Sequence, residues 1–452
     1  MKMYQVQFPI GKEKRIMDGV LFARRTPASP AEYLRVAKRA EQYVASFLEE
    51  CEDGIRFVGE KKHNHSLYDG TAGILHMYVQ FYHMLQEEQY RATALGLTAY
   101  LRKHYMEMVQ DAKENGEFVP GMAEAFYTGI GGVGLIFDEV YREFEDDNAL
   151  QGLREIVTYY REHAVYTEQG AYWSDNAPVF FDGGIALFLT AAYKTLQEPD
   201  VLNLAVRAAD YILAHGTYTD DSGLMIDHLQ VSFKHNEPNF EFGTAGIGFL
   251  FTKIYEVTGE ERYLEAAKKT VQYLRSIAVE QEQGYLIPYK PDTYPGLFYL
   301  GNCHGPVGTA KLFYELYQVT KDAYYFEQIL ELCKGIESLG APYKQSAGYW
   351  NTTCVCCGPA GFLPLYEGVY TLSGDAHWKE LQRGIGEILL GTQTEQAKFS
   401  KWRLAFDRTK PEALSEPAGF FTGTAGIAVA LLRLYENETQ GREALRLIDD
   451  PY

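Results

Sequence analysis

The sequence predicts an all-α fold, an (α/α)7 toroid in which seven helical hairpins close into a ring. A Gly-x-x-Gly turn recurs seven times, and the first positions of successive turns lie 52 to 65 residues apart. The helix after each turn is apolar nearly all round, whereas the helix before the next turn is apolar on one side only. Such a hairpin cannot cover its own apolar face, so neighbouring hairpins must stack. The apolar inner helices favour a closed ring over an open solenoid.

The helical pattern begins after a stretch without a clear period. Residues 1–30 are expected to form an N-terminal extension, and residues 31–452 a single toroid domain. Apolar residues at helical spacing over 33–48 predict the first helix. The seven turns then have their first positions at Gly70, Gly129, Phe181, Gly243, Gly305, Gly358 and Gly423. The third copy is degenerate. Because glycine permits a sharp turn into each inner helix, all seven turns are expected to line one mouth of the ring.

The segments between turns fit this scheme. Residues 247–255 are apolar nearly all round and predict a buried inner helix, while residues 263–274 predict an outer helix with one solvent face. The loops at 216–242 and 282–302 are long for a compact fold. Two interpretations stay open for them: they cover the mouth and contact a substrate, or they only fill space between the two rings of helices.

Composition excludes several classes of function. The net charge is −19 and the isoelectric point is about 5.1, which argues against sequence-independent binding to nucleic acid or to an anionic membrane. No run of 18 apolar residues occurs, so no membrane span is expected, and the first residues do not resemble a signal peptide. Four of the six cysteines cluster in two motifs, which is typical of metal or catalytic use in a reducing compartment. A cytoplasmic protein is expected.

The clustered cysteines precede two neighbouring glycine turns. Cys303 lies two residues before Gly305, and Cys356 and Cys357 lie two and one residues before Gly358. Adjacent repeats should therefore bring three sulfurs together above two helix N-termini, which favour thiolate. Three thiolates with one open position are typical of a catalytic zinc site, whereas a structural site has four ligands. A structural zinc with Cys354 or His304 as the fourth ligand is the alternative.

These motifs resemble a known family. Seven Gly-x-x-Gly turns, the Cys-His-Gly turn at 303–305 and the Cys-Cys-Gly turn at 356–358 are similar to the lanthionine synthetase C-like (LanC-like) cyclases, in the subset with three cysteine ligands. The resemblance implies a toroid around one Zn2+ held by Cys303, Cys356 and Cys357. It also implies that a substrate cysteine adds as thiolate to dehydroalanine or dehydrobutyrine in a dehydrated precursor peptide. The chain has no segment that would make the dehydro residues, so a separate dehydratase is implied as a partner.

One feature departs from the family pattern. The addition leaves an enolate that needs a proton donor, and the family places a histidine directly before the glycine of the preceding turn. Phe242 occupies that position here. His304, beside Cys303, and His235 or His228, in the preceding loop, are the candidate replacements. The family's carboxylate one repeat earlier has Asp182 nearby, although not cleanly in register. The His215-Gly216 pair ends an outer helix in register and is not expected to act.

Two other functions remain open. A toroid with 35 Tyr and 25 Phe is compatible with a carbohydrate-active enzyme, which would need paired carboxylates at the mouth, with Asp69, Asp182 and Glu241 as candidates. These residues are equally compatible with core tyrosines and acidic helix caps. The third possibility is a non-catalytic zinc toroid that binds a peptide or protein partner, which the phenylalanine at 242 favours.

Overall fold

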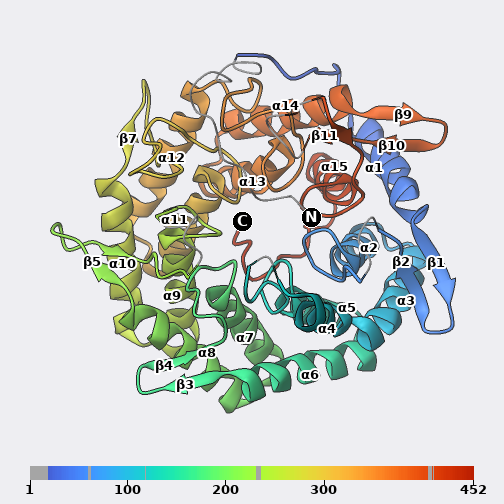
Figure 1. Cartoon of the computed structure of the whole chain (residues 1–452). Coiled ribbons are helices and arrows are strands. Elements are labelled where there is room, and N and C mark those ends of the chain that lie inside the picture. The colour runs from blue at the N-terminus through green and yellow to red at the C-terminus, as the bar shows by residue number, and fades with distance from the viewer. Residues whose placement is uncertain (1–18, 60–62, 118, 231–235, 406–409, 411) are drawn as a thin grey trace.

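The computed structural model describes the chain except residues 1–18, 60–62, 118, 231–235, 406–409 and 411, and its helices form two concentric rings (Figure 1). The inner ring consists of α2 (Thr71–Leu85), α5 (Ile130–Phe144), α7 (Asp182–Leu196), α9 (Thr244–Thr258), α11 (Pro306–Thr320), α13 (Phe362–Ser373) with the 3-10 turn η2 (Pro359–Gly361), and α15 (Thr424–Thr439). The outer ring consists of α1 (Pro30–Ala45), α3 (Glu88–His104), α6 (Asp147–His163), α8 (Pro199–Ala214), α10 (Glu261–Ser276), α12 (Ala323–Ser338) and α14 (Ala376–Thr392). The predicted (α/α)7 toroid is confirmed.

The first and last helices close the ring. The N-terminal helix α1 packs along α15, so the first outer helix pairs with the last inner helix, and α15 also packs against α2. Residues 19–29 continue this contact with the far end of the chain. Phe22 is buried and its backbone N–H donates to Tyr343, while Arg25 donates to the carbonyl of Glu387. This part of the predicted N-terminal extension is therefore packed against the toroid, and residues 1–18 lie outside the described residues.

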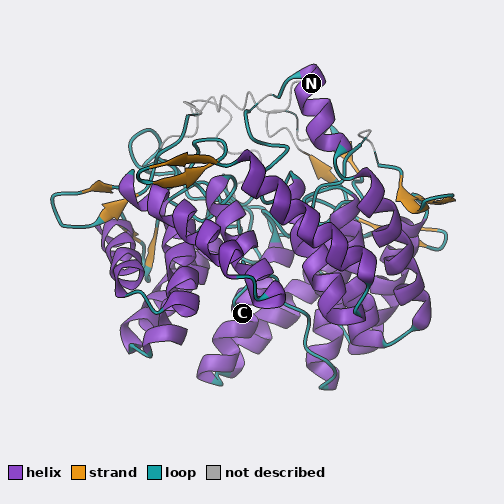
Figure 2. Ribbon diagram, turned by 90° about the horizontal axis from the view of Figure 1, so that it is seen from below, coloured by secondary structure: helices purple, strands orange, loops and turns teal. Residues whose placement is uncertain are grey.

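Short strands and one extra helix add to the predicted scheme. Six antiparallel two-stranded hairpins lie in the described part of the chain: β1 (Leu48–Cys51) with β2 (Gly54–Phe57), β3 (Val165–Thr167) with β4 (Gly170–Tyr172), β5 (Thr217–Tyr218) with β6 (Leu224–Met225), β7 (Val279–Glu280) with β8 (Tyr285–Leu286), β9 (Thr394–Gln396) with β10 (Phe399–Lys401), and β11 (Leu404–Ala405) with β12 (Leu414–Ser415). The extra helix is α4 (Glu107–Asn115). Figure 2 shows the strands and long loops gathered at one end of the helical ring, where the inner helices begin.

Close backbone approach explains why the turns contain glycine. Gly243 is the N-cap of α9, and a Cβ there would overlap the carbonyl oxygen of Glu237 in the preceding loop. A Cβ on Gly308, in the first turn of α11, would also lie too close to the carbonyl oxygen of Asn302. Any other residue would push the loop away from the helix start. Glycine therefore recurs in these turns because each pre-turn loop packs closely against the start of its inner helix.

Backbone hydrogen bonds join these pre-turn loops into a closed circuit around the mouth. Tyr68 donates to Tyr127, and Phe421 donates to Tyr68, both at 2.9 Å. The circuit continues through the other repeats as Phe126 to Phe180, Phe180 to Glu241, Glu241 to Cys303, Asn302 to Cys356, and Cys356 to Phe421. Outside the degenerate third repeat, these links include the residue two positions before each first glycine. That position therefore lines the axis of the mouth in every regular repeat.

The toroid is filled by an apolar core between the two rings. The inner helices are buried on nearly all sides over their first three turns, as in α9 and α7, whereas α10 buries only one face. No helix in the described part of the chain has the length and hydropathy of a membrane span.

Candidate metal centre

The two cysteine turns meet at the mouth. Cys303 precedes the N-cap of α11, and Cys356 and Cys357 precede the start of η2 and α13. The N–H of Asn302 donates to the carbonyl of Cys356 at 2.9 Å, so the two turns are tied together by backbone. The Sγ atoms of the three cysteines all lie within 4.8 Å of one another. Within the described residues, no other group of histidine, cysteine and acidic side chains meets this spacing.

The spacing of the sulfurs fits a single tetrahedral metal ion. The Sγ atoms of Cys303 and Cys357 are 3.6 Å apart, and those of Cys357 and Cys356 are 3.2 Å apart. Zinc holds sulfur at about 2.3 Å, which places two thiolate ligands of one ion about 3.8 Å apart. The sulfurs are too far apart for a disulfide. Cys303 and Cys356 are buried and Cys357 is partly exposed, so the cluster is reached from the Cys357 side. The residues present therefore fit a three-thiolate metal site.

Electrostatics agree with the need for a cation. Hydrogen bonds with the sulfurs of Cys303 and Cys357 hold the pKa of the Cys356 thiol well above its usual value. The pKa of Cys303 is also raised, because its hydrogen bond with Cys357 and its burial outweigh the lowering effect of the Cys356 hydrogen bond. Three thiolates this close repel one another, which favours the protonated thiols. A bound divalent cation would favour the thiolates instead.

The fourth clustered cysteine lies apart from these three. Cys354 is buried, and its Sγ accepts a hydrogen bond from the Thr352 hydroxyl at 3.0 Å. Burial raises the pKa of this thiol to about 12. Its sulfur is not among the grouped ligand atoms of the described residues. The geometry thus gives no support to Cys354 as a fourth ligand.

A tyrosine from the first repeat contacts the cluster. The hydroxyl of Tyr68 donates to the Sγ of Cys356 at 2.9 Å. Its ring stacks on Phe421 with a centroid separation of 5.2 Å and an interplanar angle of 5°. Burial, with the nearby charges of Cys356 and Glu241, raises the pKa of Tyr68 well above its usual value, so the phenol remains a donor. Tyr68 lies two residues before Gly70, the same register position as Cys303 and Cys356.

His304 is held by a buried carboxylate beside the cysteines. Its Nδ1 lies 3.1 Å from Oε2 of Glu237, which is 2% exposed. The other oxygen of Glu237 accepts from the Tyr289 hydroxyl at 3.0 Å and lies 3.3 Å from Nζ of Lys290. The imidazole stacks on Phe242 at 5.1 Å and 14°. The ring of His304 is therefore fixed against Phe242.

A second buried acid lies on the circuit. Glu241 is 2% exposed, its N–H donates to Cys303 at 3.0 Å, and its carbonyl accepts from Phe180 at 2.8 Å. Its position two residues before Gly243 places it beside the cysteine of the next repeat. The mouth near the cysteines thus carries Glu237 and Glu241 as well as the three thiols.

Asp182, another predicted catalytic residue, does not join this cluster. Asp182 is buried and accepts hydrogen bonds from the backbone of Trp173, Ser174 and Asp175 and from the Ser174 hydroxyl at 2.7 Å. Burial raises its pKa to about 6. The Asp182 carboxylate therefore stabilises the loop that precedes its own turn. His235 lies outside the described residues.

The remaining histidines of the loop have partners of their own. His228 lies 2.6 Å from the carboxylate of Asp175, which also accepts from Tyr211 at 2.7 Å. His215 stacks near His228 with a centroid separation of 4.5 Å. Asp69, a candidate for carbohydrate chemistry, accepts from the Thr422 hydroxyl. These four contacts stabilise loops around the rim.

Sequence reasoning missed Tyr68 and Glu237. Tyr68 had a usable signal, because it shares its register position with two of the three cysteines. Glu237 had none, because it lies six residues before Gly243 and reaches His304 from another repeat. Lys290 was also missed, although it lies in the 282–302 loop, which one of the two open interpretations placed at the mouth.

Comparison with known proteins agrees with this architecture. A solved structure of nisin cyclase matches with a TM-score of 0.58 and 14% identity, covering 84% of this chain and 90% of that chain. A cellobiose 2-epimerase from Bacillus thermoamylovorans B4167 matches with a TM-score of 0.49 and 13% identity, covering 89% of this chain and 98% of that chain. No curated protein matches the chain by sequence. The family model for lanthionine synthetase C-like proteins matches residues 61–444. The chain therefore belongs to the lanthionine synthetase C-like family.

Proposed function

We propose that the protein is a zinc-dependent thiol-addition enzyme that forms thioethers on peptides containing dehydroalanine or dehydrobutyrine. The observation that carries the proposal is the cluster of Cys303, Cys356 and Cys357 at the mouth, with sulfur separations of 3.2 and 3.6 Å. The partial exposure of Cys357 supports an open side where a substrate thiol can approach. The chain would then belong to the three-cysteine subset of its family.

The proposed metal ligands are the three clustered cysteines. When bound there, zinc lowers the pKa of a further thiol that joins it, so that a substrate cysteine is deprotonated at neutral pH. Three thiolates leave the site with a net negative charge, which makes an added thiolate electron-rich. The substrate sulfur forms a bond to the β-carbon of the dehydro residue, and the π-electron pair moves to the α-carbon side as an enolate.

His304 is the proposed proton donor to that enolate. Glu237 fixes the imidazole through Nδ1 at 3.1 Å, and Phe242 supports its face. With Nδ1 directed at the carboxylate, the proton for the substrate would be held on Nε2. A carboxylate behind an imidazole also stabilises its protonated form. Glu237 would act as a positioning residue. Asp182 and His235, which the sequence also suggested, have weaker support, because Asp182 is held by its own loop and His235 lies outside the described residues.

The proposed reaction implies partners. A dehydrated precursor peptide would be the substrate, and a separate dehydratase would supply it. All six cysteines are free thiols. A reducing compartment such as the cytoplasm would keep the cluster reduced, and this is the location that we propose.

A thiol-addition assay tests the proposal. The protein with one equivalent of Zn2+ is incubated with a dehydrated peptide that contains one cysteine, and loss of free thiol is followed by alkylation and mass spectrometry. Single Ser substitutions at Cys303, Cys356 and Cys357 are expected to abolish both zinc binding and thiol loss. Cys354→Ser is the matched control, since Cys354 is buried in the same segment but its sulfur stands apart. Bound zinc without thiol loss, alongside a working cyclase control, would favour the non-catalytic zinc toroid.

The carbohydrate-active alternative has less support. It requires two carboxylates at the mouth with distinct environments. Asp182 accepts four hydrogen bonds from its own loop, and Asp69 accepts from Thr422. Glu237 is committed to His304 and Lys290. These contacts favour structural and positioning roles for the acids.

A further inference from the structure

The last eleven residues run back into the centre of the toroid. After α15 ends at Thr439, Gln440 adopts a left-handed conformation and the chain turns. The N–H of Arg442 donates to the carboxylate of Glu436 at 2.9 Å, which fixes the turn. The chain then passes between the inner helices, and its C-terminus lies inside the ring in Figure 1. We call residues 442–452 the axial segment.

Gln80 of α2 recognises the backbone of the axial segment. Its side-chain oxygen accepts from the N–H of Leu445 at 3.1 Å, and its Nε2 donates to the carbonyl of the same residue at 3.0 Å. Gln80 is 1% exposed, and Glu139 holds its amide through a further hydrogen bond at 3.2 Å. A buried side-chain amide that hydrogen-bonds both the N–H and the carbonyl of one residue binds an extended peptide, whatever side chain that residue carries.

Two aspartates of the axial segment contact basic side chains of the inner helices, and one of them also accepts a hydrogen bond from a tyrosine hydroxyl. Asp449 is 3% exposed, accepts from the Tyr127 hydroxyl at 2.8 Å and lies 3.5 Å from Nζ of Lys311. Asp450 lies 3.4 Å from the guanidinium of Arg433. Lys311 and Arg433 project from α11 and α15, which places positive charge on the channel wall where the segment carries negative charge. Charge complementarity of this kind sets the register of a bound peptide.

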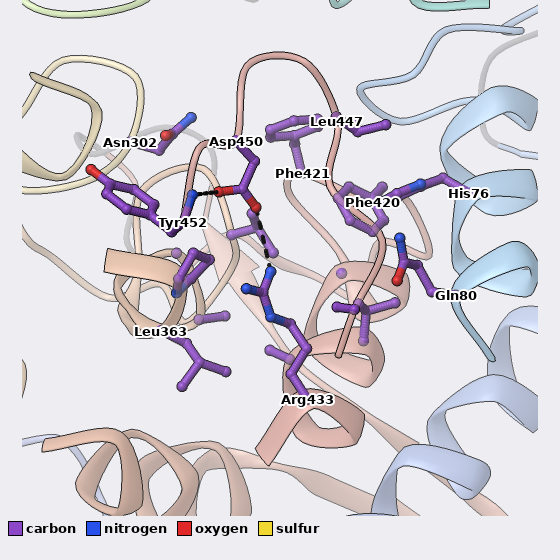
Figure 3. Close-up of a pocket in the computed structure, with 18 of the residues that line it drawn as sticks. His76, Gln80, Asn302, Leu363, Phe420, Phe421, Arg433, Leu447, Asp450 and Tyr452 are labelled. Atoms are coloured by element: carbon purple, nitrogen blue, oxygen red, sulfur yellow. Dashed lines mark hydrogen bonds and ion pairs between the residues drawn. The ribbon is translucent and has the colours of Figure 1, made fainter. Parts of the chain in front are cut away.

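The terminal aromatic residue fills a fitted pocket. Tyr452 is 2% exposed and its hydroxyl donates to the carbonyl of Val307 at 3.2 Å. Its ring packs edge-on against Tyr314 at 5.1 Å. A Cβ on Gly368 would lie 2.7 Å from the ring, so glycine at this point of α13 makes room for it. Tyr452, Asp450 and Leu447 line a cavity of about 90 Å3. In Figure 3, Asp450 points toward Arg433 of α15.

We propose that the axial channel is a sequence-specific peptide-binding site and that its ligand is the axial segment of the same chain. Backbone pairing at Leu445, two paired aspartates and a seated tyrosine are four independent contacts, spread over 445–452 and made by α2, α11, α13, α15 and the pre-turn loop of α5. The ligand class is an acidic peptide that carries Asp-Asp two residues before an aromatic side chain. Its role is to close the ring on the side away from the mouth.

The inference does not depend on the proposed function. None of the contacts involves Cys303, Cys356, Cys357 or His304, and the binding test uses no zinc and no dehydrated peptide. A failure of the thiol-addition assay would leave the channel site standing, and a failure of the peptide test would leave the cyclase proposal standing.

Peptide exchange in the cleaved full-length protein provides the test. A site for a specific protease is inserted between the exposed residues Gln440 and Gly441, and the folded protein is cut. We expect the fragment to remain with the toroid on gel filtration and to exchange for a fluorescent synthetic peptide of residues 442–452. A peptide with Asp449→Asn and Asp450→Asn should bind about tenfold more weakly or worse, and a scrambled peptide should not bind. Release of the fragment without rebinding, while the toroid stays folded, would overturn the proposal.

Hydrogen exchange on the uncut protein covers the case in which cutting unfolds the toroid. Residues 445–452 should be protected to the level of the inner helices in the native chain. Gln80→Leu should speed exchange in this segment while α9 and α10 stay protected. Rapid exchange of the segment in the unaltered chain would show that the channel does not bind it and would refute the inference.

Discussion

Removing the Tyr68 hydroxyl tests the proposed metal centre through a residue that is not among its proposed ligands. Tyr68→Phe deletes one hydrogen bond, the 2.9 Å contact to the Sγ of Cys356. Cys356 is 2% exposed, so water cannot easily replace the lost donor. With three thiolates around one divalent ion the site is anionic, and a donor to one sulfur disperses the excess charge.

The expected magnitude follows from outer-sphere contacts of this type. Their loss typically lowers metal affinity by about 10- to 100-fold. This corresponds to about 1.4–2.7 kcal/mol of binding free energy. Zinc affinity is measured by competition with a chromophoric chelator, and the absorption of the Co2+-loaded protein reports on the sulfur environment. The Phe421 stack remains available to a phenylalanine ring, so the fold should be preserved.

Tyr127→Phe supplies the matched control. Tyr127 occupies the same register position in the next repeat and is fully buried, but its hydroxyl donates to Asp449 and not to sulfur. This variant should lower the free energy of unfolding by about 1–3 kcal/mol and change zinc affinity less than twofold. Equal losses of zinc affinity in both variants, or an unchanged affinity in Tyr68→Phe, would refute the reasoning.

Two further predictions concern the buried acids. Glu237→Gln should lower kcat for thiol addition about tenfold or more, with little change in KM or zinc content, because His304 loses the charge that orients it. Glu315→Gln is the control, since it breaks a comparable buried pair with Lys253 and should leave kcat unchanged. A rise in KM alone for Glu237→Gln would count against a positioning role for Glu237. Asp182 has its pKa raised to about 6 by burial, so the folded chain holds this proton more tightly than the unfolded chain. The free energy of unfolding should therefore fall by about 3 kcal/mol as the pH rises from about 4 to about 6, and denaturant titrations of Asp182→Asn should lack this component, whereas parallel pH curves would contradict it.

The repeat architecture could be predicted because each repeat needs the same local contact, and that contact leaves the same residues in the sequence. Each glycine turn brings a carbonyl of the preceding loop against the start of an inner helix, as Glu237 meets Gly243, and only glycine permits that contact. The register of Cys303 and Cys356 followed from the same turns, so the convergence of the sulfurs was also predictable. The short hairpins were not predicted, because their two- to four-residue strands leave no clear period in the sequence. The helix α4 was not predicted either, since it stands outside the repeating pair of helices.

Contacts between repeats could not be predicted in the same way. Glu237 reaches His304, and Gln80 reaches Leu445, across 67 and 365 residues of sequence. Nothing local in the sequence marks such pairs, since Glu237, His304 and Gln80 each look like an ordinary polar residue of a loop or a helix, and Leu445 is contacted through its backbone. Asp182 shows the same limit from the other side. The sequence could not reveal that this carboxylate accepts four hydrogen bonds from its own loop, so its catalytic role stays a prediction.

Register position is the property that links this fold to its chemistry. Outside the third repeat, the residue two places before the first glycine of each turn takes part in one closed hydrogen-bonded circuit, so Tyr68, Cys303 and Cys356 can meet although they come from three repeats. The residue one place before the glycine forms a second layer, in which Phe242 stacks on His304 at 5.1 Å. The side chains one place before Gly243 and Gly305 are therefore direct neighbours. On this argument, phenylalanine at 242 is compatible with proton transfer at the mouth, provided that Glu237 orients the neighbouring histidine.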